Sequence, residues 1–144
     1  MAGIRTATLA DAPRLAELSG TLGYPVAASQ LAATLERLLP RRDHAVFVAT
    51  NPDRVVGWIH VADREILEVG RLAEILGLVV DASVRRLGIG QRLVAAAEAW
   101  AAAHGLPAVT VRSNIVRPES HPFYEALGYV RIKTQHTYRK PLVS

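Results

Sequence analysis

The chain has 144 residues, of which 50% are apolar and 21% are charged, and these figures are typical of one domain with its own hydrophobic core. The absence of cysteine excludes disulfide scaffolds, cysteine-ligated zinc sites and thiol nucleophiles. Because we find neither an apolar run of the ~20 residues that a membrane helix needs nor a secretory signal, we expect a cytoplasmic protein with no membrane partner.

The 17 basic and 13 acidic residues give a net charge of +4, and the arginines are spread from Arg5 to Arg139. A mildly positive surface suits an anionic small ligand as well as it suits RNA. The chain has no block of five or six like charges and no clustering of aromatic with basic residues, which counts against a nucleic-acid-binding protein. We therefore expect no nucleic-acid partner.

Hydrophobic periodicity predicts a single domain over residues 1–144 with the element order β-α-α-β-β-β-α-β-α-β-β. Asp11 is expected to cap the first helix, Pro40 to follow the second, and Gly105 and Gly128 to end the last two. The predicted strands cover residues 4–7, 45–50, 55–61, 72–80, 108–112, 129–132 and 135–139, and the last two helices cover 88–104 and 118–127. Hairpin-joined strands followed by a β-α-β unit predict a mixed sheet, an α+β (α/β mixed-sheet) fold.

A glycine-bearing turn, Gly88-Ile89-Gly90, joins the apolar strand 72–80 to the long helix. Two glycines one residue apart let the backbone approach a ligand closely, and the first turn of a helix offers free N–H groups to a diphosphate. A dinucleotide fingerprint would need glycine in place of Leu93, and the chain has no Gly-Lys-Ser/Thr of a P-loop. The alternative is an ordinary turn whose glycines only permit close packing.

The pattern Arg85-x-x-Gly88-x-Gly90 after an apolar strand resembles the coenzyme A loop of the GNAT (GCN5-related) N-acetyltransferases. Residues 73–80 are similar to the fourth strand of that family. Residues 114–129, with Phe123-Tyr124-Glu125, are similar to its second signature. The resemblance covers essentially the whole chain and implies a GNAT-like acyl-CoA N-acyltransferase fold, with acetyl-CoA as cosubstrate and no metal.

The resemblance also implies which residues hold acetyl-CoA. The main chain of residues 78–80 would pair with the pantetheine arm and polarise the thioester carbonyl. The amides of 86–91 would hold the diphosphate, and Asn114 would bind the pantetheine or simply be a turn residue. We expect Gly77 to mark a bulge in the strand. The implied cofactor-binding residues are Leu78, Val79, Val80, Arg85, Arg86, Leu87, Gly88, Ile89, Gly90, Gln91 and Asn114.

Two catalytic residues are implied. Tyr124 would be the general acid that returns a proton to the thiolate, since a phenol has a pKa near 10; the alternative is a core tyrosine. Glu74 is a carboxylate in an apolar strand, where burial would raise its pKa toward that of a useful base. Glu74 occupies the position from which some family members take the proton of the amine, but it could instead form a salt bridge with an arginine.

The acceptor pocket is expected from the first two helices and the neighbouring strands. Trp58 and His60 share a strand face by period-2 alternation, and Tyr24 lies in the connection between the helices. Residues 62–71 are predicted to be a loop whose acidic side chains either attract a cationic amine or form a solvated rim, and the rim is favoured. The acidic residues of that loop are Asp63, Glu65 and Glu68.

The resemblance implies an N-acetyltransferase that moves an acetyl group from acetyl-CoA to a primary amine by direct attack in a ternary complex. A small-molecule acceptor is favoured over a peptide or protein amine, and a homodimer is expected because relatives commonly dimerise. The alternative from a different class is a catalytically weak CoA-binding regulatory module.

Overall fold

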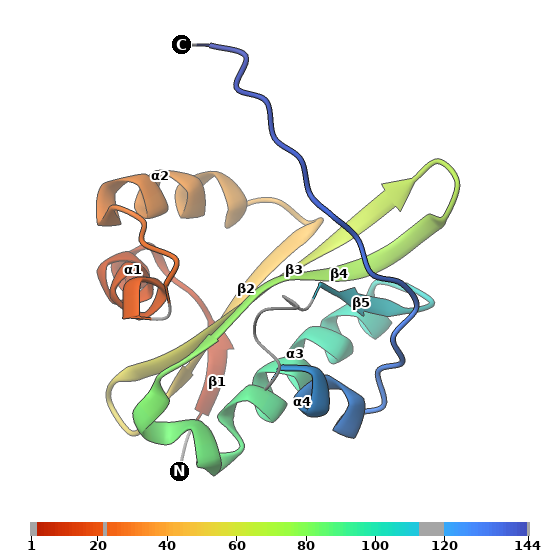
Figure 1. The fold of residues 1–144 in the computed structure, drawn as a ribbon. Helices are drawn as coiled ribbons and strands as arrows, with labels where there is room; N and C mark the ends of the chain where they lie inside the picture. Colours follow the sequence, from red (N-terminus) through yellow and green to blue (C-terminus); the bar gives the residue numbers. More distant parts are fainter. Residues whose placement is uncertain (1–2, 22, 113–119, 144) are drawn as a thin grey trace. The chain divides into compact units, whose positions relative to one another are not determined.

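The computed structural model describes residues 3–21, 23–112 and 120–143, and it consists of two compact units, Met1–Arg112 and Ser113–Ser144. The first unit holds a five-stranded sheet with helices on both of its faces (Figure 1). The second holds one short helix and an extended segment of chain. The first unit therefore supplies the framework for most of the predicted site residues.

The sheet has the strand order β1-β2-β3-β4-β5, with every neighbouring pair antiparallel except β4 and β5, which are parallel. This confirms the predicted mixed sheet. The strands are β1 (Gly3–Thr6), β2 (His44–Thr50), β3 (Val55–Ile66), β4 (Gly70–Val80) and β5 (Val109–Val111). The helices are α1 (Ala12–Thr21), α2 (Ala28–Leu38), α3 (Ile89–Ala103) and α4 (Ser120–Ala126), with 3-10 turns η1 (Leu9–Asp11) and η2 (Ala82–Leu87).

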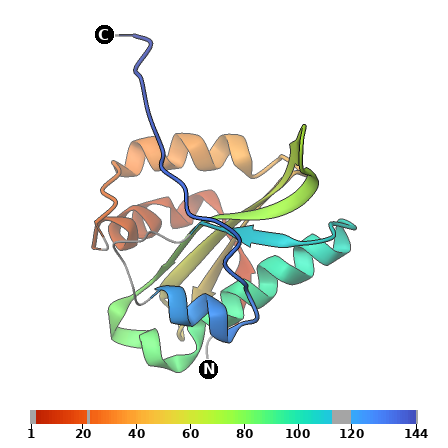
Figure 2. The ribbon, with the colours of Figure 1, turned by 45° about the vertical axis from the view of Figure 1, so that its right-hand side comes forward.

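Alternation along the strands divides the core between the two faces of the sheet. Val46, Val48 and Val79 pack with the leucines of α1 and α2 on one face. Ile59 and Val61, which alternate with them across the pairing register, are fully buried on the face that α3 covers (Figure 2). α1, α2 and α3 therefore each pack in the first unit through an apolar stripe, as their periodicity predicts.

The prediction of a loop over residues 62–71 was wrong, because β3 and β4 continue as a hairpin to a three-residue turn at 67–69. Pairing of Arg64 with Leu72 and of Ile66 with Gly70 extends the ladder. Charged residues in this stretch resemble a loop in composition, but a two-stranded ribbon keeps them solvated while its backbone is still paired.

The first helix begins differently from the prediction that Asp11 is its N-cap. Thr8 is the cap of the η1 turn, and its N–H donates to the Asp11 carboxylate at 2.8 Å. Asp11 also accepts two hydrogen bonds from Arg5, and the Arg5 guanidinium holds the pKa of this carboxyl below its usual range. Asp11 thus stabilises the helix start from the third position of a capping box.

In the second unit, α4 and the following Gly128 (φ +91°) agree with the predicted short helix. The strands predicted at 129–132 and 135–139 were wrong, since residues 129–143 contain no strand. Val130 and Ile132 are 81% and 76% exposed. Their residue types favour a strand, but a strand forms only where another edge accepts its hydrogen bonds, and an isolated two-stranded hairpin is marginal in water.

Candidate active site

The first feature of the site is the edge of β4 beyond the end of β5. β5 pairs with β4 only over Ala73, Glu74 and Ile75, whereas β4 continues against β3 as far as Val80 (Figure 1). Within the described part of the first unit, the main chain of residues 78–80 is therefore paired on one edge only. An extended ligand with amide groups can add to such an edge as a further strand.

A β-bulge lies at the start of this edge, as predicted for Gly77. His60 pairs with Gly77 and Val61 pairs with Ile75, so Leu76 is the extra residue on β4. The ring of Trp58 covers Gly77 so closely that an added Cβ would lie 2.7 Å from Cη2 of the indole. Glycine is thus required here by a close approach.

Replacing Gly77 with alanine should lower the free energy of unfolding by about 1–3 kcal/mol, because the added methyl group must displace the Trp58 ring. Urea unfolding measures the effect, and Trp58→Phe in the same chain should restore part of it. Gly20→Ala is the matched control, since no atom lies within 4 Å of a Cβ built there and alanine favours a helix. The packing argument would be disproved if Gly77→Ala lowered the free energy of unfolding no more than Gly20→Ala does.

The turn between β4 and α3 presents main-chain N–H groups. It is a 3-10 turn, η2, followed by Gly88 in the left-handed conformation (φ +74°), so α3 begins at Ile89 rather than at 88. The N–H of Arg92 makes the first intrahelical bond, to the Gly88 carbonyl at 3.1 Å. The amides of residues 89–91 precede this bond and are the ones that a helix start leaves for another acceptor.

Asp81 fixes the start of this turn. Its carboxylate accepts from the N–H and the hydroxyl of Ser83 at 3.0 and 2.9 Å, and it pairs with Arg14 at 2.8 Å. The Ser83 hydrogen bonds, followed by Arg14, hold the pKa of Asp81 below its usual range. The side chains of Arg85 and Arg86 lie outside the described part of the chain, as does all of Asn114.

Glu74 lies where β4 and β5 are still paired, opposite Ala62 on β3 and Thr110 on β5. The residue is 5% exposed, and its two carboxylate oxygens each contact a guanidinium at 3.1 Å: Oε1 contacts Nη1 of Arg64, and Oε2 contacts Nε of Arg112. The salt bridge that the sequence left open as an alternative role is therefore present. A buried carboxylate held by two cations keeps its charge compensated.

Trp58, His60 and Glu74 share one face of the sheet, since Glu74 pairs directly with Ala62 and the β3 residues alternate. The indole N–H of Trp58 is buried and, within the described residues, lacks an acceptor. His60 Nε2 lies 2.9 Å from Nδ1 of His44, and burial, with a smaller effect of His44, lowers the pKa of His60 to about 4. Trp58 and His60, which were predicted to line the acceptor pocket, therefore lie on the same face of the sheet as Glu74. The imidazole of His60 is uncharged at neutral pH.

The pKa of His60 makes stability depend on pH. Because the folded pKa lies below the unfolded value of 6.5, the unfolded chain binds the proton first, and the stabilisation present above pH 6.5 is lost as the pH falls toward 4. We expect the free energy of unfolding to decrease by about 2 kcal/mol across this range through His60, measured by urea unfolding at each pH. His60→Gln should flatten this slope and the exposed control His136→Gln should not; equal slopes in all three proteins would contradict the assignment.

Tyr24 and Tyr124 lie on other parts of the chain. Tyr24, in the connection between α1 and α2, is 50% exposed, and its N–H donates to the Ser19 carbonyl at 3.0 Å. Tyr124, on α4 of the second unit, packs edge-on against the rings of Phe123 and Tyr129, with ring centroids 5.0 and 5.9 Å apart. Burial raises the pKa of Tyr124 to about 12, so its hydroxyl keeps its proton well above neutral pH.

Sequence reasoning missed three residues that contact His60 or Glu74: His44, Arg64 and Arg112. A strand extended to Ile66 would have placed Arg64 on the face of His60 by alternation. The acidic side chains of the hairpin lie on other surfaces. Asp63 alternates with Arg64 and pairs with Arg71 at 2.7 Å.

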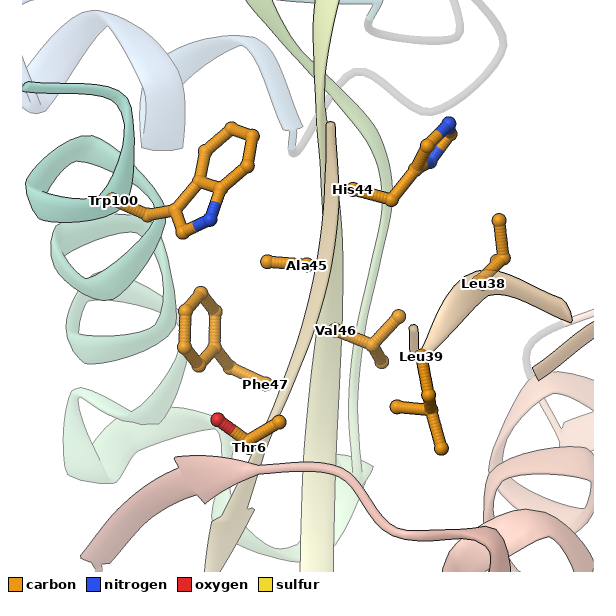
Figure 3. A pocket seen from close by; sticks show the side chains of 8 residues that line it. All are labelled: Thr6, Leu38, Leu39, His44, Ala45, Val46, Phe47 and Trp100. Carbon is orange, nitrogen blue, oxygen red and sulfur yellow. The ribbon is translucent and has the colours of Figure 1, made fainter. Parts of the chain in front are cut away.

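A cavity of about 240 Å³ lies near the other edge of the sheet, beside His44–Phe47 at the beginning of β2. Trp100, Ala45 and Phe47 lie on one side of β2 there, and Val46 and Leu39 lie on the other (Figure 3). Two of its lining residues on β2, His44 and Val46, lie on the same face of the sheet as Glu74. Within the described residues, no group of three metal-ligating side chains is close enough to bind an ion, and no helix is long and apolar enough to cross a membrane.

Comparison with known proteins identifies the family. Residues 14–129 match the model of the acetyltransferase (GNAT) family. The chain is 31% identical over 105 residues to an aminoglycoside N(6')-acetyltransferase type 1 of Klebsiella aerogenes, a match that covers 70% of this chain and 69% of that protein.

Solved structures share the fold. An aminoglycoside N-acetyltransferase, AAC(6')-Iy, solved in complex with CoA, has a TM-score of 0.87 and 21% identity, covering 97% of this chain and 95% of that one. A structure described as a transcriptional regulator from Bacillus halodurans C-125 has a TM-score of 0.87 and 23% identity, covering 97% and 100%. With the family model matched over most of its length, this chain belongs to the acetyltransferase (GNAT) family and is an enzyme of the N-acetyltransferase class.

Proposed function

We propose that the protein transfers the acetyl group of acetyl-CoA to the primary amine of a small molecule by direct attack in a ternary complex. The observation that carries this proposal is the edge of β4 at residues 78–80, which is unpaired within the described part of the first unit and leads directly into the turn before α3, where a helix start leaves its first amides for another acceptor. Relatives support the donor and the acceptor class, since one structure with this fold holds CoA and another holds a bisubstrate analogue of CoA and acetylneamine.

The donor would bind along β4. The main chain of 78–80 would pair with the amides of the pantetheine arm, and the N–H groups at the start of α3 would donate to the diphosphate oxygens at the positive end of the helix dipole. The bulge at Gly77 turns the strand where the thioester would lie.

The reaction needs three proton transfers. Glu74 accepts a proton from the acceptor ammonium, directly or through a water molecule, and the neutral nitrogen then attacks the thioester carbon. The C–N bond forms, the C–S bond breaks, and the sulfur leaves with the electron pair. Tyr124, whose role rests on the resemblance of residues 114–129 to the family signature, donates its hydroxyl proton to that sulfur. The nitrogen, which is cationic after the attack, loses its second proton to the resulting tyrosinate through solvent, and this restores the phenol and gives the neutral amide.

Calorimetric titration with acetyl-CoA, followed by a free-thiol assay with a panel of small amines, tests the proposal. We expect binding and amine-dependent release of CoA. Binding without turnover over a broad panel would support the alternative, a CoA-binding regulatory module, and absence of binding would refute both. The homodimer and the cytoplasmic location stay proposals, and light scattering of the purified protein tests the first.

A further inference from the structure

We infer that the acceptor carries an anionic group, a carboxylate or a phosphate, close to its reactive amine, and that Arg64 and Arg112 bind this group. The inference rests on the proposed function and narrows its substrate class to amines of the amino-acid kind, as opposed to polycations. It is carried by the ion cluster of Glu74, Arg64 and Arg112 at the point where β4 and β5 stop pairing.

The two arginines reach Glu74 from opposite sides. Arg64 comes from β3 and Arg112 follows β5, and each contacts a different oxygen of the carboxylate. Arg64 contacts the carboxylate through Nη1 and Arg112 through Nε, and a guanidinium has five N–H donors in a planar fork. The side chain of Arg64 is 42% exposed and that of Arg112 is 69% exposed, whereas that of Glu74 is 7% exposed. Glu74 therefore holds two guanidiniums whose outer edges face solvent.

The local charge is positive. One carboxylate between two guanidiniums leaves a net charge of +1. The two histidines of this face add no charge at neutral pH, since burial lowers the pKa values of both His44 and His60. Asp63, for which the sequence left open a role in attracting a cationic amine, lies on the opposite face and is paired with Arg71.

An acceptor with both an ammonium and an anion matches this arrangement. Glu74 lies between the guanidiniums, so the amine and the anionic group must be separated by only a few bonds, as in an α-amino acid or an aminoalkyl phosphate. A forked guanidinium matches the two oxygens of either group. A polycationic amine would place its additional ammonium groups beside the exposed edges of the two arginines, where like charges repel.

Matched pairs of amines test the inference through the rate of CoA release. The pairs are L-alanine and ethylamine, L-phenylalanine and phenethylamine, L-lysine and cadaverine, and O-phosphoethanolamine and ethanolamine, with neamine as the polycation. We expect the anionic member of at least one pair to have a kcat/KM about 10- to 100-fold higher than that of its partner, the range that a lost charge-assisted hydrogen bond produces. The last pair separates phosphate from carboxylate recognition.

Variants locate the effect. Arg64→Gln and Arg112→Gln should each remove most of this preference, because KM should rise more for the acceptor that carries the anion than for its partner without the anion. Arg71→Gln, which alters an ion pair on the other face, is the control and should keep the preference. The rise in the melting temperature of the protein on addition of each acceptor, measured in the presence of CoA, gives a second readout that does not need turnover.

The outcomes separate the inference from the proposed function. If ethylamine, cadaverine or neamine reacts and binds as well as the anion-bearing acceptors or better, the inference of an anionic group on the acceptor is overturned, and the proposed acetyltransferase function still stands. A preference that survives both arginine variants would overturn their role. No acetylation of any amine, with anion-dependent binding still lost in the arginine variants, would refute catalysis and keep the anion site; no binding of any acceptor would refute the anion site as well.

Discussion

Replacing Tyr124 with phenylalanine should lower kcat for acetyl transfer by about 100- to 1,000-fold, with the Kd for acetyl-CoA unchanged within about threefold. In the proposed mechanism the phenol supplies the proton that the departing thiolate needs, and phenylalanine keeps the ring contacts with Phe123 and Tyr129 while removing the hydroxyl. Because burial raises the pKa of Tyr124 to about 12, the hydroxyl stays protonated, and we expect the native enzyme to show no loss of activity through this group up to pH 10.

Steady-state thiol release measures kcat, and calorimetry measures the affinity for acetyl-CoA. Tyr129→Phe is the matched control, since it removes a hydroxyl from the neighbouring ring of the same unit. A thermal melt of each variant checks that the fold is intact. Near-native turnover of Tyr124→Phe would show that another group protonates the sulfur, and an equal loss in Tyr129→Phe would indicate a structural effect.

Most of the framework of the site could be predicted from local patterns. Alternation in β3 indicated that Trp58 and His60 share a face, and Gly105 (φ +71°) ends α3 as expected of a helix C-terminus. Gly77 marks a bulge because a glycine inside an apolar strand has few other uses. These predictions depend on one residue and its near neighbours, which is why the sequence alone supports them.

Other features depend on partners that are distant in the sequence. The hairpin beyond residue 61 forms because β3 and β4 pair with each other, a fact that its charged composition conceals. The strands predicted after α4 have the right residue types but no pairing edge within their unit. The two ion pairs of Glu74 join residues of β4 and β3 and the residue that follows β5. The sequence could therefore offer a salt bridge as an alternative without naming Arg64 or Arg112.

Replacing Glu74 with glutamine should lower kcat at neutral pH by about 100- to 10,000-fold, because an amide cannot accept the proton of the acceptor ammonium. The substitution keeps the shape of the side chain and removes the negative charge between Arg64 and Arg112. Both arginines are substantially exposed, so water screens them, and we expect an unfolding cost of only about 1–2 kcal/mol.

The dependence on pH distinguishes a base from a structural residue. If Glu74 removes the proton, the defect of Glu74→Gln should shrink as the pH rises toward the pKa of the acceptor, since more of the amine is then already neutral in solution. Glu65→Gln, on a neighbouring exposed position of β3, is the control and should leave the profile unchanged. A loss that is the same at pH 7 and pH 9.5 would mean that Glu74 only positions the two guanidiniums, and the proton would then leave through water.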